Sequence, residues 1–299
     1  MRGLWPFAFL IIVMPVQADD VAVRPVVPGS FAVKLQRRIE AVPKSGQIQV
    51  VVETQEWKAA ETAIIICDMW DNHYCQSSAQ RVKEMTPRMN AVLTAARNHG
   101  VQIIHSPSGV THFYADTSYR RRMQEAPRVI PPFPLESWCH RDEKREPELP
   151  VDVSKQACDD PEVGPAVRVF HRQNVGLDII GYDGISDNGD EIYGFCKTHG
   201  IKNIVMMGVH TNMCVLGRPF GIRQLVRLGF NVALARDLTD AMYDPRQPPF
   251  VSHTRGTEMV IEHIEHFWCP SLEGADLTKV ISGSADPSLK PSNPSNSPK

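Results

Sequence analysis

The chain has 299 residues, a formal net charge of −2 at pH 7 and seven cysteines. A charge this close to neutral argues against a nucleic acid as the main partner, because such a partner calls for an excess of lysine and arginine. None of the cysteines forms a close CxxC pair, which argues against a zinc ribbon.

The first 18 residues have the pattern of a secretory signal peptide. Arg2 precedes an apolar run from Phe7 to Met14, and Val16-Gln17-Ala18 is a small-residue cleavage pattern. The apolar run is too short to span a bilayer as a helix, although an uncleaved anchor is the alternative. We therefore expect an exported protein, periplasmic or extracellular, with no membrane contact once the signal is removed.

Residues 271–299 are expected to form a C-terminal tail. From about Ser282 this segment is rich in Ser, Pro and Asn, and Leu289 is its only large apolar residue. Such a segment cannot bury enough surface to offset its chain entropy, so we expect disorder from there and no contribution to folding. Residues 61–270 then form the folded domain, and residues 19–60 precede it as an extension.

The extension is expected to form a β-hairpin packed on the edge of the domain. Two segments of alternating apolar and polar residues, around Leu35 and Val50, flank the turn Lys44-Ser45-Gly46. The domain begins with Ala63–Cys67, a continuous apolar run that is typical of a buried parallel strand. This strand ends at Asp68. Open α/β sheets place their ligands beside residues at such strand ends.

Helices and strands alternate through the rest of the domain. The spacing of apolar residues predicts strands at 101–104, 167–170, 202–209 and 232–235, and helices at 77–99, 187–199, 214–228 and 254–267. This alternation predicts an α/β fold with a doubly wound, mostly parallel sheet and helices on both faces. Residues 109–165 interrupt the pattern, and we expect them to form an insertion over the ligand-binding face, with a lid as one role.

The cysteines differ in their surroundings. Cys139 and Cys158 flank a polar, proline-containing part of the insertion, and we predict that they pair in an oxidising compartment. Closing a loop of this size would stabilise the fold by about 3 kcal/mol in the chain-entropy model. Cys67 lies in an apolar strand and Cys196 on a helix, so both are expected to be inert core thiols.

Cys214 lies where a predicted strand ends and a predicted helix begins. The helix dipole and the free N–H groups at such a position favour the thiolate, which is the nucleophilic form. A small buried apolar side chain is the alternative role. A carboxylate beside this thiol could accept its proton, and doubly wound topology can place Asp68 there.

These segments resemble the isochorismatase-like cysteine hydrolases, a superfamily that includes nicotinamidase and N-carbamoylsarcosine amidase. The sequence IIICDMWD matches the first strand of that family, with Asp68 as the catalytic acid, and GVHTNMCV matches its Gly-Val-x-Thr-x-x-Cys-Val signature, with Cys214 as the nucleophile. The segment Gly229–Asp240 matches the Gly-x-x-Val, strand and Asp that follow. The resemblance spans roughly residues 62–269 and implies a Rossmann-like three-layer fold. It also implies a cis peptide bond between Val209 and His210, with the N–H groups of His210 and Cys214 as an oxyanion hole.

The chain departs from the family at the third catalytic residue. Where the family has a lysine after the third strand, this sequence has His171-Arg172-Gln173. Arg172 is slightly favoured as the replacement because of its permanent charge, although it hardly gives up a proton. His171 could both carry charge and shuttle protons near neutral pH.

Three side chains are candidates for contacting a substrate: Trp70, His105 and His210. Trp70 would offer a stacking face, although a place in the core is the alternative. Metal-binding members of the family use an Asp-x-His after the second strand, and here that strand ends in His105-Ser106-Pro107. We therefore expect no metal or other cofactor. A divalent metal near His73, His105 or His210 is the alternative.

The sequence thus predicts an exported cysteine hydrolase that cleaves a C–N bond of a small amide or ureide. Cys214 would attack the carbonyl carbon, with Asp68 as acid and base and Arg172 or His171 as the cation. An ether hydrolase of the isochorismatase type would not need the thiol. The alternative from another class is a non-catalytic protein that binds a small molecule on the same fold, because the lysine is replaced. A small molecule is the expected partner, and the formation of a homo-oligomer is a further possibility that the sequence leaves open.

Overall fold

The computed structural model describes residues 22–43 and 45–285. The predicted signal peptide lies outside the described residues, as does the chain beyond residue 285. Within the described ranges, no helix is both long enough and apolar enough to cross a membrane. Ser284 belongs to the segment that we expected to be tail, and its hydroxyl accepts a hydrogen bond from the N–H of Ser30 at 3.1 Å.

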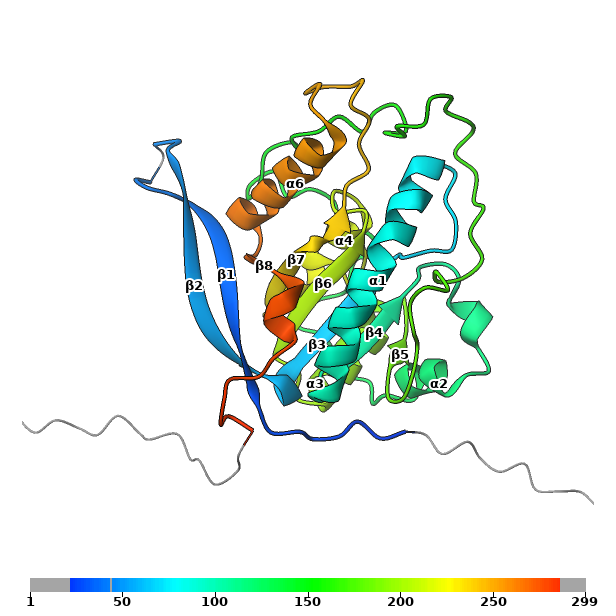
Figure 1. The fold of residues 1–299 in the computed structure, drawn as a ribbon, viewed down its shortest axis with the longest axis vertical. Coiled ribbons are helices and arrows are strands. Elements are labelled where there is room, and N and C mark those ends of the chain that lie inside the picture. Colours follow the sequence, from blue (N-terminus) through cyan, green and yellow to red (C-terminus); the bar gives the residue numbers. More distant parts are fainter. Residues whose placement is uncertain (1–21, 44, 286–299) are drawn as a thin grey trace, which may run out of the picture.

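One eight-stranded sheet carries the domain, in the order β2-β1-β8-β7-β6-β3-β4-β5 (Figure 1). The strands are β1 Ser30–Glu40, β2 Ile48–Lys58, β3 Thr62–Cys67, β4 Gln102–Ser106, β5 Gly184–Ile185, β6 Asn203–Val209, β7 Asn231–Asp240 and β8 Ser271–Leu272. The α-helices are α1 Gln76–Asn98, α2 Ser118–Gln124, α3 Gly189–Thr198, α4 Cys214–Gly217, α5 Ile222–Arg227 and α6 His253–Phe267. Short 3₁₀ helices lie at η1 Ala59–Glu61, η2 Thr111–Tyr114 and η3 Gly274–Leu277.

The strands from β8 to β5 run parallel, while β1 is antiparallel to both β2 and β8. All six residues of β3 are buried, as an uninterrupted apolar run predicts for a strand covered on both faces. Ile64 packs in a cluster with Leu93 of α1, whereas Ile65 packs with Phe195 of α3 and Ile264 of α6. The predicted doubly wound sheet with a hairpin at its edge is confirmed.

The order of the strands creates a switch point between β3 and β6. The chain leaves β3 toward β4 on one side and later returns to β6 on the other side. Two neighbouring parallel strands therefore end together, with Cys67 of β3 opposite Gly208 of β6. Open α/β sheets bind their ligands at such a point.

Gly208 lets the backbone of β6 approach β3 closely. It has φ +103°, and a Cβ atom there would lie 2.1 Å from the carbonyl oxygen of Cys67. Gly208→Ala should therefore lower the free energy of unfolding by about 3 kcal/mol, measured by urea denaturation. Gly200→Ala is the matched control, because Gly200 also has a positive φ, +67°, but faces open space. Equal losses in the two variants would contradict a role for the close approach.

The predicted helix after Cys214 is wrong in one respect, because it is two short helices, α4 and α5. Arg218 between them has extended backbone angles, φ −62° and ψ 158°. It precedes Pro219, whose ring disfavours a helical conformation in the residue before it. The apolar residues that indicated a helix here, Leu216, Phe220 and Leu225, are nevertheless all buried.

The predicted strand at residues 167–170 is also wrong. These residues join no sheet, and the strand beside β4 is instead the two-residue β5. Val167 is 52% exposed, so the alternating pattern of this segment reflects an arm on the surface rather than a core strand. Strand propensity has no effect where no neighbouring strand is present to pair with it.

The insertion begins with η2 and α2, and after Gln124 it runs as a long irregular loop along the domain (Figure 1). Its cysteines attach to different elements: the Cys139 thiol lies 2.8 Å from the Gln224 side-chain oxygen of α5, whereas Cys158 lies beside Cys75 at the start of α1. The predicted disulfide between Cys139 and Cys158 is therefore wrong, and none of the seven cysteines is bridged in this structure. Their flanking segments fold onto separate parts of the domain, which sequence spacing does not reveal.

Candidate active site

Asp68 lies directly after β3, at the switch point, and is completely buried. Its backbone adopts φ +47°, and its carboxylate accepts two hydrogen bonds. The N–H of Ser108 donates to Oδ1 at 2.6 Å, and Nε of Arg218 donates to Oδ2 at 3.1 Å. Burial raises the pKa of this carboxyl above its usual value, while the guanidinium of Arg218 acts in the opposite direction.

Cys214 follows the neighbouring strand β6 and opens the single turn of α4. Its side chain interacts with both Asp68 and Arg218, and the residue keeps 8% of its surface exposed. The expected pair of Asp68 and Cys214 is therefore brought together, because β3 and β6 are adjacent. A thiol and a carboxylate in this arrangement can exchange a proton.

The surroundings of the Cys214 thiol favour its protonated form, whereas the helix dipole was expected to favour the thiolate. Burial raises its pKa well above the usual value, and the negative charge of Asp68 raises it further, while Arg218 acts to lower it. The helix that follows has only four residues, so the dipole effect expected from a long helix is small. Asp68 is the carboxylate placed to accept a proton from this thiol.

Arg218 is the cation of this site, and the sequence analysis missed it. Its extended backbone turns the chain between α4 and α5, and its guanidinium pairs with Asp68. The indole ring of Trp138 from the insertion lies over it, with the guanidinium carbon 5.6 Å from the ring centroid. The signal that could have revealed it is the Arg-Pro pair with a glycine two residues later, which predicts a break in the helix.

The two residues that we expected in this role lie elsewhere. The guanidinium carbon of Arg172 is 4.9 Å from the centroid of the Phe113 ring, and His171 is exposed. In the part of the chain that the structure describes, neither side chain hydrogen-bonds or ion-pairs with Asp68 or Cys214. Their backbone N–H groups both donate to Oδ1 of Asp71, at 2.9 and 3.4 Å.

His210 is the other residue whose N–H group we expected in the oxyanion hole. The peptide bond between Val209 and His210 is cis, as the family resemblance predicted. The ring is buried, and its Nε2 lies 2.6 Å from the hydroxyl oxygen of Ser78 in α1. Burial lowers the pKa of His210 to about 3, so the ring is neutral near pH 7. The role of the His210 and Cys214 N–H groups as oxyanion donors stays a prediction.

The other expected pocket residues make internal contacts. Both ring nitrogens of the fully buried His105 have partners, Oε1 of Gln173 at 3.0 Å and Oδ2 of Asp183 at 3.1 Å. Trp70 is buried and stacks on Phe170, with ring centroids 4.2 Å apart. Both environments match the structural roles weighed as alternatives more closely than a role in contacting a ligand.

The histidines considered for a metal do not converge as a ligand set. The ring centroids of His73 and His210 are 5.1 Å apart, while His105 is held by its own partners. Between residues 22 and 285, leaving out residue 44, three side chains have ligand atoms close enough together to hold an ion, and they are Cys75, Cys158 and Asp160. None of the three histidines belongs to that group.

Two cavities lie beside Asp68 and Cys214. One, of about 490 Å³, is lined by Ser108 and Arg218, among others, and by the acidic residues Asp187 and Asp190. The other, of about 640 Å³, reaches Met213, the residue before Cys214. Its remaining walls come mainly from the insertion and include Trp138, His140, Leu149 and Val151. Small organic molecules fit cavities of this size.

A buried ion cluster fastens the insertion beside the site. The carboxylate of Glu146 accepts a hydrogen bond from Nε of Arg223 in α5 and lies 2.8 Å from Nε2 of His263 in α6. The backbone N–H of Cys139 also donates to the carbonyl of Gly217 in α4. The insertion therefore packs directly on the two helices that follow Cys214, which supports its predicted position over the ligand face.

Glu146→Gln should remove part of the acid sensitivity of the fold. Burial acts to raise the pKa of Glu146, but hydrogen bonds from His263 and Arg223 outweigh it and lower the pKa to about 2. A carboxyl with a lowered pKa contributes stability above its unfolded value of about 4.3, and that contribution is lost as the pH falls toward 2. The variant should have a lower melting temperature than the wild type at pH 7. Its melting temperature should then fall less steeply than that of the wild type below pH 4.

Melting temperatures measured from pH 7 to pH 2 check this prediction. Glu148→Gln is the control, because Glu148 is 82% exposed and pairs only with Arg141 among the described residues. Such a surface pair contributes little to stability, so the control should follow the wild-type curve. Parallel acid curves for the wild type and Glu146→Gln would contradict the assignment.

Comparison with known proteins places these features in context. A family model described as "Isochorismatase domain" matches residues 62–263. A search of curated proteins found no significant match. Three solved structures resemble this one: a cysteine hydrolase from Pseudomonas syringae pv. phaseolicola 1448A, an isochorismatase-like hydrolase from Alkaliphilus metalliredigens and an isochorismatase from Pseudomonas putida KT2440.

The first is 16% identical, with 74% of this chain and 92% of that one covered and a TM-score of 0.46. The second is 12% identical, with 74% and 98% covered and a TM-score of 0.42. The third is 12% identical, with 73% and 90% covered and a TM-score of 0.43. Identities this low carry no information about the substrate of this chain.

Proposed function

The chain belongs to the isochorismatase family, and on this premise we propose that it is a cysteine hydrolase that cleaves a C–N bond of a small amide or ureide. The single observation that supports this most is the placement of Cys214 and Asp68 beside each other after adjacent strands, with Arg218 paired to the same carboxylate. These three groups supply a nucleophile, a proton acceptor and a fixed positive charge. The chemistry can be written with these residues alone.

In the first half of the reaction, Sγ of Cys214 attacks the carbonyl carbon of the substrate while its proton passes to the carboxylate of Asp68. The C–N bond then breaks, and Asp68 returns the proton to the leaving nitrogen, which leaves a thioester on Cys214. In the second half, water gives a proton to Asp68 and attacks the thioester. The acid is released, and Cys214 regains its proton.

The environment of the site supports this proton transfer. Burial raises the pKa of Asp68, which makes its carboxylate a stronger base than an exposed aspartate. Arg218 remains protonated throughout, so it holds Asp68 in place and stabilises negative charge as the thiol is deprotonated. Arg218 would thus take the part that the family gives to its lysine, from another element of the fold.

The alternative function is a non-catalytic protein that binds a small molecule, and the absence of a lysine from residues 171–176, where the family pattern has one, favours it. A screen of small amides and ureides for released ammonia or amine separates the two, with Cys214→Ala as the control. Turnover that is lost in Cys214→Ala, together with an acyl adduct mapped to Cys214, supports the hydrolase. Ligand binding that is equal in both proteins, without turnover, would show that the binding function is correct.

We also propose that the protein is exported, from the pattern of its first 18 residues. N-terminal sequencing of the mature protein tests this, and a mature chain that still begins at Met1 would refute cleavage at Ala18.

A further inference from the structure

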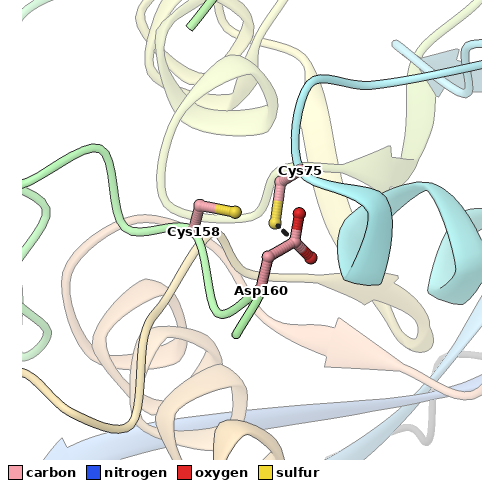
Figure 2. Close-up of side chains that lie close together, drawn as sticks. All are labelled: Cys75, Cys158 and Asp160. Atoms are coloured by element: carbon pink, nitrogen blue, oxygen red, sulfur yellow. Dashed lines mark hydrogen bonds between the residues drawn. The ribbon is translucent and has the colours of Figure 1, made fainter. Parts of the chain in front are cut away.

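Two cysteines outside the Cys214 site face each other across the boundary between the insertion and the core. Cys75 immediately precedes α1, and Cys158 lies in the last part of the insertion. Their sulfur atoms and a carboxylate oxygen of Asp160 all lie within 4.8 Å of one another. Figure 2 shows the sulfur atom of Cys158 turned toward that of Cys75, which lies between it and the carboxylate of Asp160. Both side chains are buried in a small apolar cluster with Ala157 and Met242.

We propose that Cys75 and Cys158 form a disulfide that fastens the end of the insertion to the N-terminus of α1. In the reduced form, the buried Cys75 thiol lies 3.5 Å from an oxygen of Asp159 and 3.7 Å from an oxygen of Asp160. A disulfide needs no hydrogen-bond partner, so it can be buried in an apolar cluster without leaving a polar group unsatisfied. Its formation requires the Cys75 side chain to turn from Asp160 toward Cys158, whose sulfur already lies within 4.8 Å.

A metal ion is the other occupant that these ligand atoms suggest, and the structure favours it less. Both oxygens of Asp160 already accept backbone N–H groups, from Gln76 at 2.8 Å and Ser77 at 2.7 Å, where they cap α1. A structural zinc site needs a fourth ligand and deprotonated thiols. Burial raises the pKa of both Cys75 and Cys158, which disfavours the two standing thiolates that a metal would need. The same shift slows disulfide formation, but that reaction needs only one transient thiolate at a time, and its product is neutral.

The reaction is a thiol–disulfide exchange with a low-molecular-weight disulfide such as oxidised glutathione. One cysteine thiolate attacks the external disulfide, forms a mixed disulfide and releases one molecule of thiol. The second cysteine attacks the mixed disulfide, which forms the Cys75–Cys158 bond and releases a second molecule of thiol. Two S–H bonds are lost, and the external disulfide takes up the two electrons and two protons.

The bridge would restrain the loop that carries Cys214. Asp159 pairs with Arg81 of α1 at 2.7 Å, and Arg81 also pairs with Asp240 at the end of β7 at 2.9 Å. The carbonyl of Asp240 accepts the N–H of Thr211, three residues before Cys214. Closing the disulfide would therefore fix one end of a continuous chain of polar contacts that leads to the nucleophile.

Counting thiols in the full-length protein tests the proposal. The protein is equilibrated with a glutathione redox buffer, denatured and alkylated without reductant, and its mass is measured. Two of the seven cysteines should escape alkylation, leaving five adducts, and seven should form after reduction. Digestion without reductant should yield a peptide that joins Cys75 to Cys158. Seven adducts before reduction, or a bridge between other cysteines, would overturn the proposal.

Two variants and a metal assay complete the test. Cys139→Ser, which changes another buried cysteine, should keep the bridge, whereas Cys158→Ser should show the same number of adducts with and without reductant. Zinc bound in equal amount to the wild-type protein and lost in Cys158→Ser would overturn the disulfide in favour of a metal. If Cys158→Ser does not fold, the wild-type count alone decides. None of these readouts depends on hydrolysis, so they are independent of the proposed function.

Discussion

Replacing Asp68 with Asn should lower kcat on an amide substrate by about 10³-fold, because general acid–base groups contribute factors of that order. The amide of Asn cannot take the proton of Cys214 or return it to the leaving nitrogen. The variant keeps the shape of the side chain, and its oxygen can still accept the Ser108 N–H that the carboxylate accepts at 2.6 Å. Steady-state kinetics at pH 7 provide the measurement, and a melting curve checks the fold.

Asp71→Asn is the matched control for this variant. Asp71 follows the same strand, but it accepts backbone N–H groups of His171 and Arg172 and does not touch the thiol. The control should keep most of its activity. The wild-type rate should also fall as the pH drops through the raised pKa of Asp68, which lies above the value of about 3.9 for an exposed aspartate. Full activity in Asp68→Asn would rule out the proposed proton transfer.

Arg218→Gln should slow the alkylation of Cys214 by iodoacetamide at pH 7 by about tenfold or more, the effect of one pKa unit on the thiolate fraction. The guanidinium acts to lower the pKa of this thiol, and the charge of Asp68 acts to raise it. Removing the guanidinium leaves the carboxylate charge unopposed. Alkylation rates measured across pH, with the adduct mapped to Cys214, report the change directly.

Arg172→Gln and His171→Ala are the controls, because both change residues that the family pattern points to. Neither should alter the alkylation rate, since the Arg172 guanidinium lies over the Phe113 ring and His171 is exposed. A slower rate in Arg172→Gln with no change in Arg218→Gln would reverse our assignment. Arg172 would then be the cationic partner of Cys214, at the position where the family has its lysine.

The positions of Asp68 and Cys214 could be predicted from the sequence because short local patterns determine them. A continuous apolar run marks a buried strand, and the residue after it lies at the carboxyl edge of the sheet. The doubly wound order of the strands then places the two residues side by side. Arg218 could not be predicted in the same way, since Leu216, Phe220 and Leu225 keep one helical spacing across the break.

The contacts of the insertion were beyond the reach of such patterns. Cys158 lies beside Cys75 and Glu146 beside His263, and each pair is far apart in the sequence. No periodicity links an irregular loop to the surface on which it folds, so the cysteine spacing suggested the wrong partner for Cys158. The same holds for Asp160, which caps α1 from the insertion in place of a residue next to the helix.

The candidate reacting groups and the wall of the adjoining cavity come from separate parts of the chain, and this matters for laboratory evolution. Asp68, Cys214 and Arg218 are held by strand ends and a tight turn, and the spacing of β3 and β6 is set by backbone contact at Gly208. The wall of the larger cavity is built mainly by the insertion. A library that varies Leu149 and its neighbours in that wall can therefore explore new substrates while the reacting groups keep their places.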